Sequence, residues 1–136
     1  MSAPAVAVSA DGKQFAVAWK DMRTGQPQIQ WSKAETPAFT SDAPIHKLGQ
    51  ARQDHPSLAV DAQGIIWMAW EEKVGGNQQI WIRSSNTDDQ ARIVSDNNEG
   101  QLSFPVIACH TGFVGVVYES RKEGKATVRF RLLKSQ

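Results

Sequence analysis

Large apolar residues alternate with small or polar residues along three separate stretches of the chain. In the first stretch Phe15, Val17 and Trp19 are separated by alanines. Residues 66–70 read IWMAW and residues 114–118 read VGVVY, so large side chains again occupy every second position. Successive side chains of a β-strand point to opposite faces, so this period of two predicts three strands. No stretch has a convincing helical period, and the pattern as a whole predicts an all-β chain.

The three stretches belong to a longer unit that occurs three times. Each copy runs through a proline, an apolar alternation, a glycine turn and an aromatic residue. Superposition aligns Pro4 with Pro56 and Pro105, Gly12 with Gly64 and Gly112, and Trp19 with Trp70 and Tyr118. A period of about 50 residues fits four short strands joined by tight turns, which is the size of one propeller blade.

The repeat predicts where the strands lie in a single domain covering residues 1–136. We expect blades at about 4–50, 55–96 and 104–134. First strands are expected at 4–9, 56–61 and 105–109, second strands at 14–20, 65–71 and 113–119, third strands at 27–33, 78–84 and 126–133, and weaker fourth strands at 43–48 and 90–95. The third copy lacks a fourth strand. Its second strand avoids charge on both faces, which is typical of a sheet packed between two neighbours.

One copy carries a family resemblance. Residues 56–72, PSLAVDAQGIIWMAWEE, are followed by QIWIRSS, and together they resemble a blade of the sialidase-like, or BNR-repeat, β-propellers. The resemblance extends to all three copies and implies a propeller, typically of six blades. Many members carry an Asp box, S-x-D-x-G-x-T-W, after the third strand. The corresponding turns at 32–39 and 84–91 lack its glycine and tryptophan.

The catalytic residues of the family's enzymes cannot be located in this chain. Enzymes of that family use an arginine cluster, a tyrosine nucleophile paired with a glutamate, and an aspartate acid/base. Tyr118 is the one tyrosine of the chain, and it occupies the repeat position of Trp19 and Trp70. A recurrent aromatic position is typical of blade packing, so we assign no catalytic residue.

Charged loops mark one end of the predicted blades as a candidate binding surface. In a propeller the loops between second and third strands, and those leading into each first strand, gather on one face. Arg23, Lys73 and Arg121 could there hold an anionic or hydroxylated ligand, or the loops could simply form a solvated surface. Glu71 and Glu72 are strand neighbours that point to opposite faces, so they cannot flank one bond. The candidate ligand-binding residues are Lys20, Asp21, Arg23, Arg52, His55, Glu71, Glu72, Lys73, Glu119 and Arg121.

Composition excludes several partners. Fifteen Lys and Arg balance fourteen Asp and Glu without a basic run, which argues against binding to nucleic acid or to an anionic membrane. The histidines at 46, 55 and 110 have no metal-ligand spacing, and we expect neither metal nor cofactor. Cys109 lies in the apolar run VIAC and is expected to be a buried structural thiol. The chain as given has no transmembrane stretch and no secretory leader, so we expect a soluble domain of undetermined location.

Three blades cannot close a ring, because propellers have four to eight. The simplest expectation is a homodimer that forms a six-bladed ring, while a fragment of a longer protein or a half completed by another protein is the competing explanation. Three functions remain open. They are a non-catalytic module that binds carbohydrate or anionic small ligands, a degenerate glycosidase, and a pure protein-interaction or assembly module.

Overall fold

The computed structural model describes residues 2–35, 38–39, 41–47, 51–86 and 90–135. These residues form eleven strands and no helix, in three antiparallel sheets. The first sheet contains β1 (Ala5–Val8), β2 (Gln14–Asp21), β3 (Gln28–Glu35) and β4 (Ala43–Pro44). The second contains β5 (Arg52–Val60), β6 (Ile66–Val74), β7 (Asn77–Ser84) and β8 (Arg92–Ile93). The third contains β9 (Gln101–His110), β10 (Phe113–Lys122) and β11 (Lys125–Lys134).

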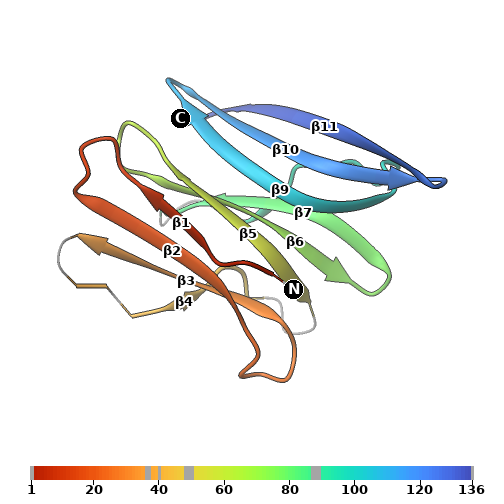
Figure 1. Cartoon of the computed structure of the whole chain (residues 1–136), viewed down its shortest axis with the longest axis horizontal. Coiled ribbons are helices and arrows are strands. Elements are labelled where there is room, and N and C mark those ends of the chain that lie inside the picture. The colour runs from red at the N-terminus through yellow and green to blue at the C-terminus, as the bar shows by residue number, and fades with distance from the viewer. Residues whose placement is uncertain (1, 36–37, 40, 48–50, 87–89, 136) are drawn as a thin grey trace.

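The sheets stand side by side like blades, and we call them blades 1, 2 and 3 in chain order (Figure 1). Strand order follows chain order in every blade, so β1, β5 and β9 are the first strands, and neighbouring ones among them lie against each other (Figure 1). This confirms the all-β fold predicted from the period of two. The expected strands are found in all three copies, with the third blade limited to three strands.

The predicted strand ends needed correction at the charged hairpins. Segments 71–78 and 119–126 were expected as loops, but β6 and β7 are joined only by Gly75 and Gly76, and β10 and β11 only by Glu123 and Gly124. Positive φ angles of 62° at Gly75, 52° at Glu123 and 77° at Gly124 allow these tight turns. The expectation failed because charged residues on an extended hairpin look like loop residues in a sequence. The fourth strands are also shorter than expected, with two residues each.

Neighbouring blades bury apolar faces against each other. Between blades 1 and 2 the alanines of β2 pack under the large side chains of β6; this cluster includes Ala16, Ala18, Ile29, Leu58, Ile66, Met68 and Trp70. Between blades 2 and 3 the opposite face of β6 meets β10; this cluster includes Trp67, Ala69, Ile80, Ile82, Ile107, Val114, Val116 and Tyr118. Tyr118 is 1% exposed, which confirms its predicted packing role.

Candidate functional site

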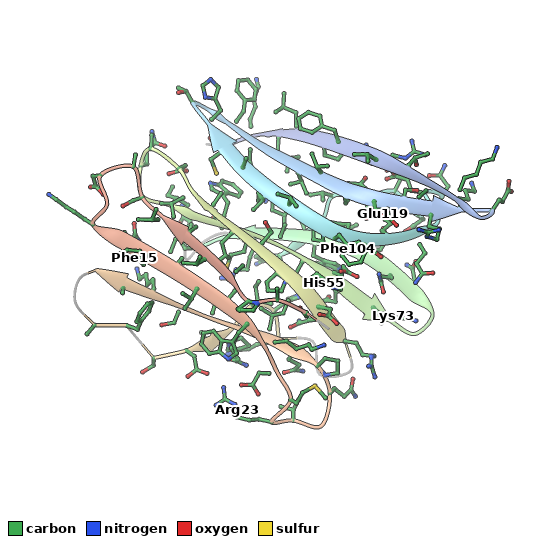
Figure 2. All side chains as sticks on the ribbon, in the orientation of Figure 1. Phe15, Arg23, His55, Lys73, Phe104 and Glu119 are labelled. Atoms are coloured by element: carbon green, nitrogen blue, oxygen red, sulfur yellow. The ribbon has the colours of Figure 1, made fainter. Side chains whose placement is uncertain are left out.

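Two residues that precede prolines have an unusual backbone near the beginning of the inner strands β5 and β9, which start at Arg52 and Gln101, four residues before the expected starts at 56 and 105. His55 of β5 and Phe104 of β9 have φ angles of 49° and 57°. A residue before proline normally adopts an extended conformation, and left-handed conformations are rare for residues other than glycine. Both residues lie where the strand register shifts, and their rings meet edge to face with centroids 4.7 Å apart (Figure 2). Strained backbone of this kind is often found at functional sites.

The carboxylate of Glu71 contacts both residues of this pair. Its Oε2 contacts Nδ1 of His55 and accepts a hydrogen bond from the backbone N–H of Phe104 at 3.3 Å. The side-chain amide of Gln78 donates to Oε1 at 2.9 Å. Burial raises the pKa of Glu71, and the neighbouring His55 only partly offsets that effect.

A second carboxylate approaches His55 from its own strand. Oδ1 of Asp54 lies 3.8 Å from Nδ1 of His55 and accepts the backbone N–H of His55 at 2.9 Å. Nζ of Lys20, at the end of β2, donates to Oδ2 of Asp54 at 3.2 Å and so links blade 1 to blade 2. Burial opposes ionisation of Asp54, but hydrogen bonds from Ser2, His55 and Lys20 outweigh it and lower the pKa of Asp54.

The site therefore brings together three of the sequence-predicted residues, Lys20, His55 and Glu71. Asp54, Phe104 and Gln78 were not predicted. Phe104 could have been found, because it occupies the repeat position of His55 directly before a strand-opening proline. We call Lys20, Asp54, His55, Glu71 and Phe104 the inner-strand site.

The other candidates lie elsewhere. The Arg23 guanidinium is held at 2.7 Å by Asp21 and at 2.6 Å by Asp42 on the outer face of blade 1. Arg52 and Lys73 are paired in register near the β6–β7 hairpin, and Arg121 contacts Glu119 at 3.3 Å on blade 3. Arg23, Lys73 and Arg121 thus belong to three different blades, and each of the two arginines is paired with a carboxylate of its own blade.

Glu72 points away from Glu71 and is buried between blades 1 and 2, so the structure does not place it on the expected ligand-binding surface. Its side chain is fully enclosed and accepts hydrogen bonds from Trp70 Nε1 at 3.1 Å and from Gln53 Nε2 at 2.9 Å. Nδ1 of His46 lies 3.0 Å from the same Oε1. The opposite orientations of the two glutamates follow from their adjacent positions on β6. Glu72 holds the blade junction together and is not accessible to a ligand.

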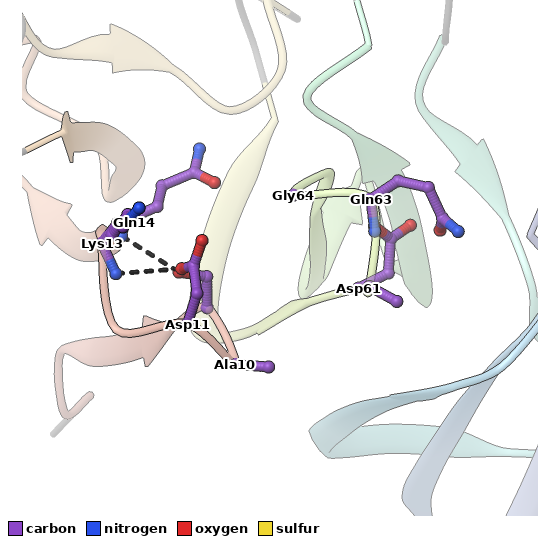
Figure 3. A pocket seen from close by; sticks show the side chains of 9 residues that line it. Ala10, Asp11, Lys13, Gln14, Asp61, Gln63 and Gly64 are labelled. Carbon is purple, nitrogen blue, oxygen red and sulfur yellow. Dashed lines mark hydrogen bonds between the residues drawn. The ribbon is translucent and has the colours of Figure 1, made fainter.

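A pocket lies at the opposite ends of the strands. It has a volume of about 650 Å³ and separates the β1–β2 turn from the β5–β6 turn (Figure 3). Asp11 in it accepts Ser9 Oγ at 2.6 Å and the Lys13 N–H at 3.0 Å. Asp61 accepts two backbone N–H groups and, at 3.0 Å, the indole N–H of Trp67. Both carboxylates stabilise their own turns, so we do not place the functional site there.

Two further observations concern the described residues only. They contain no group of three or more His, Cys, Asp or Glu side chains arranged to hold a metal ion. They also contain no helix that is long and apolar enough to cross a membrane.

Comparison with known proteins supports the fold. No protein-family model and no curated protein matches the sequence. Among solved structures, an α-L-arabinanase from Penicillium chrysogenum complexed with arabinobiose matches 88% of the chain with a TM-score of 0.58 and 11% identity. An endo-arabinanase of the GH43 family from Bacillus licheniformis matches 97% of it with a TM-score of 0.56 and 13% identity. The chain spans only 40% and 51% of these two proteins.

Both arabinanases are β-propellers of five blades. At this level of identity the likeness shows the propeller-like fold alone. It supports the fold that the sialidase-like resemblance implied, whereas membership of the sialidase-like family stays a prediction.

Proposed function

We propose that this chain is a carbohydrate-binding β-propeller module whose binding surface is centred on the inner-strand site. The observation that carries this proposal is the pair of left-handed residues before proline, His55 and Phe104, held together at the start of adjacent inner strands. Such a conformation costs free energy that ordinary strand pairing would avoid. Ligand binding gives a reason for retaining it in two blades.

The chemistry of the site suits a sugar. Phe104 is 54% exposed and offers an apolar ring to the C–H face of a sugar. Lys20 and Asp54 are each about one third exposed in their side chains, and they offer a donor and an acceptor for hydroxyl groups. With Nδ1 of His55 turned to Glu71, the other ring nitrogen, Nε2, lies on the opposite edge of the imidazole. The likeness to a structure that contains arabinobiose suggests this disaccharide as the first probe.

The arrangement of carboxylates favours binding over hydrolysis. A glycosidase places two carboxyl groups on either side of the scissile bond, roughly 5 to 9.5 Å apart. Asp54 and Glu71 instead both approach the same nitrogen of His55. The imidazole therefore occupies the space that a glycosidic bond would need, and we assign the module a non-catalytic role.

Titration with arabinobiose, followed by amide chemical shifts in NMR, tests this function. Binding should move the resonances of His55, Phe104 and their strand neighbours. Phe104→Ala should weaken binding at least tenfold through loss of the aromatic surface. Phe39→Ala is the matched control, because Phe39 is 55% exposed on blade 1, outside the inner-strand site. Binding that is equally strong in both variants would place the ligand elsewhere.

The two other functions give different results in parallel assays. Hydrolysis of an aryl arabinofuranoside that is lost in Glu71→Gln would identify a glycosidase and overturn the non-catalytic role. An absence of shifts with arabinobiose and with a broad glycan array would reject carbohydrate binding. It would leave the protein-interaction module as the remaining candidate.

A further inference from the structure

The second strand of each blade directs different side chains toward the two sides of its sheet. In blades 2 and 3 the second strand turns three large residues toward the preceding blade, and in blade 1 it turns two alanines toward the following blade. In β6, Ile66, Met68 and Trp70 belong to the cluster with blade 1, whereas Trp67 and Ala69 belong to the cluster with blade 3. In β2 the alanines Ala16 and Ala18 face blade 2.

Blade 1 has an open face of the large type. Phe15, Val17 and Trp19 of β2 occupy the repeat positions of Ile66, Met68 and Trp70, on the side of the sheet away from blade 2. Val6 and Val8 of β1 share this face and are 67% and 50% exposed. In the described chain this face has no blade to pack against.

Blade 3 has an open face of the small type. Gly115 and Val117 of β10 occupy the repeat positions of Ala16 and Ala18. A Cβ atom on Gly115 would lie 3.1 Å from the Phe130 ring, so the glycine allows Phe130 to lie close against the sheet. The exposed apolar side chains of this face include Val106, Val117, Phe130 and Leu132.

We propose that these two faces bind each other between two copies of the chain, so that blade 3 of each copy packs on blade 1 of the other. An exposed apolar patch of this extent on a soluble domain marks an interaction surface. The two open faces have the complementary pattern of the junction between blades 1 and 2, where the alanines of β2 meet the large side chains of β6. Two copies form two identical junctions and leave no open face, which is the closed arrangement that a twofold axis produces.

The length of a matched propeller agrees with two copies of the chain. The chain matches 97% of its own length to 51% of the Bacillus licheniformis propeller. One further copy therefore supplies about as much structure as the chain lacks relative to that protein. Two copies give six blades, one more than the arabinanases have.

A polar contact is also available at the proposed junction. Lys20, Glu71 and Glu119 occupy one repeat position. Lys20 pairs with Asp54 across the first junction, and Glu71 accepts the N–H of Phe104 across the second. Glu119 would accept the N–H of Ala3 from the second copy, because Ala3 occupies the repeat position of Phe104.

Light scattering after size exclusion measures the oligomeric state of the full chain. The expected mass is twice the 15.0 kDa of one chain. Val117→Asp should produce a monomer, because the new charge would be buried at both junctions. Val74→Asp is the matched control: Val74 is 50% exposed near the β6–β7 hairpin, on neither open face, and this variant should remain a dimer. A wild-type monomer, or an open-ended series of larger species, would overturn the proposal.

Cross-linking tests which faces meet and does not depend on the aspartate variant folding. Val17→Cys and Val117→Cys are introduced into separate copies of a Cys109→Ala background. Oxidation should give a disulfide-linked dimer only when the two variants are mixed, because blade 3 of one copy meets blade 1 of the other. Cross-linking of Val117→Cys with itself, or failure of the mixture to cross-link, contradicts this arrangement.

Discussion

His55 and Phe104 occupy equivalent positions in successive blades, and both hold a left-handed backbone directly before a proline with their rings 4.7 Å apart. The side chains of ordinary L-residues disfavour this conformation, and glycine adopts it freely. The contacts of both residues with Glu71 keep the conformation in place. The inner-strand site is thus built around a left-handed backbone conformation that occurs at the same repeat position in two blades.

The first prediction compares His55→Gly with His55→Ala. Both substitutions remove the imidazole, but alanine keeps the steric strain at φ 49°. We expect the glycine variant to be more stable than the alanine variant by about 1 kcal/mol, measured by urea unfolding. Lys73, on β6 outside the positive-φ positions, serves as the control, and there alanine should be the more stable replacement. The same preference for alanine at both positions would contradict the strain argument.

The arrangement of strands could be predicted because it depends on local periodicity. Alternation of large and small residues at 14–20 and 113–119 predicts strands without knowledge of their tertiary contacts. The recurring proline and glycine positions define the length of the repeat. The lack of a fourth strand in the third copy was also expected, because only residues 134–136 remain after the expected third strand. Hydrophobic period and turn residues are therefore sufficient for the fold class.

Only part of the site could be predicted, because it depends on a strand bulge and on the length of a hairpin, which the hydrophobic period does not specify. His55 was identified as a residue before a strand-opening proline, but its contact with Glu71 depends on the bulge that bends β5. Glu72 was listed as a candidate ligand-binding residue, whereas the extended hairpin carries it into the junction with blade 1. A charged residue is normally predicted to be exposed, but three polar partners make burial of the Glu72 carboxylate possible.

The second prediction concerns the buried carboxylate of Glu72. Glu72→Ala would leave the indole N–H of Trp70 and the amide of Gln53 without their acceptor in the interior. We expect a loss of about 3 kcal/mol in the free energy of unfolding, measured by urea denaturation. Lys73→Ala, at the adjoining half-buried position, should cost less than about 1 kcal/mol. Equal losses at the two positions would show that the network around Glu72 contributes little.

The third prediction concerns pH and Glu99. Burial alone would raise the pKa of Glu99, but the Asp96 N–H, the Tyr118 hydroxyl and Arg131 outweigh it and hold the pKa below its usual 4.5. A carboxyl with a lowered pKa stabilises the fold above its unfolded pKa, and that stabilisation is lost as pH falls through the folded pKa. The stability difference between wild type and Glu99→Gln should therefore be largest at pH 6 to 7 and shrink below about pH 4.

Thermal melts across this range measure the difference. Glu71→Gln is an informative comparison, because burial raises the pKa of Glu71 and its linkage has the opposite sign. The ionised form of Glu71 is disfavoured in the fold, so this carboxyl contributes less stability as pH rises through its folded pKa. A pH-independent gap between wild type and Glu99→Gln would contradict the role of Glu99.

The last prediction concerns the reactivity of Cys109. Burial, followed by the negative charge of Asp61, raises the pKa of Cys109 to about 11. The thiolate is the reactive form, so at pH 8 only ~0.1% of the native protein should be reactive, against about a quarter of an unfolded chain with an ordinary thiol. A disulfide reagent should therefore label the native protein roughly 200-fold more slowly than the same protein in urea. A native rate close to the unfolded rate would mean that Cys109 is an accessible thiol rather than the structural residue that its apolar surroundings indicate.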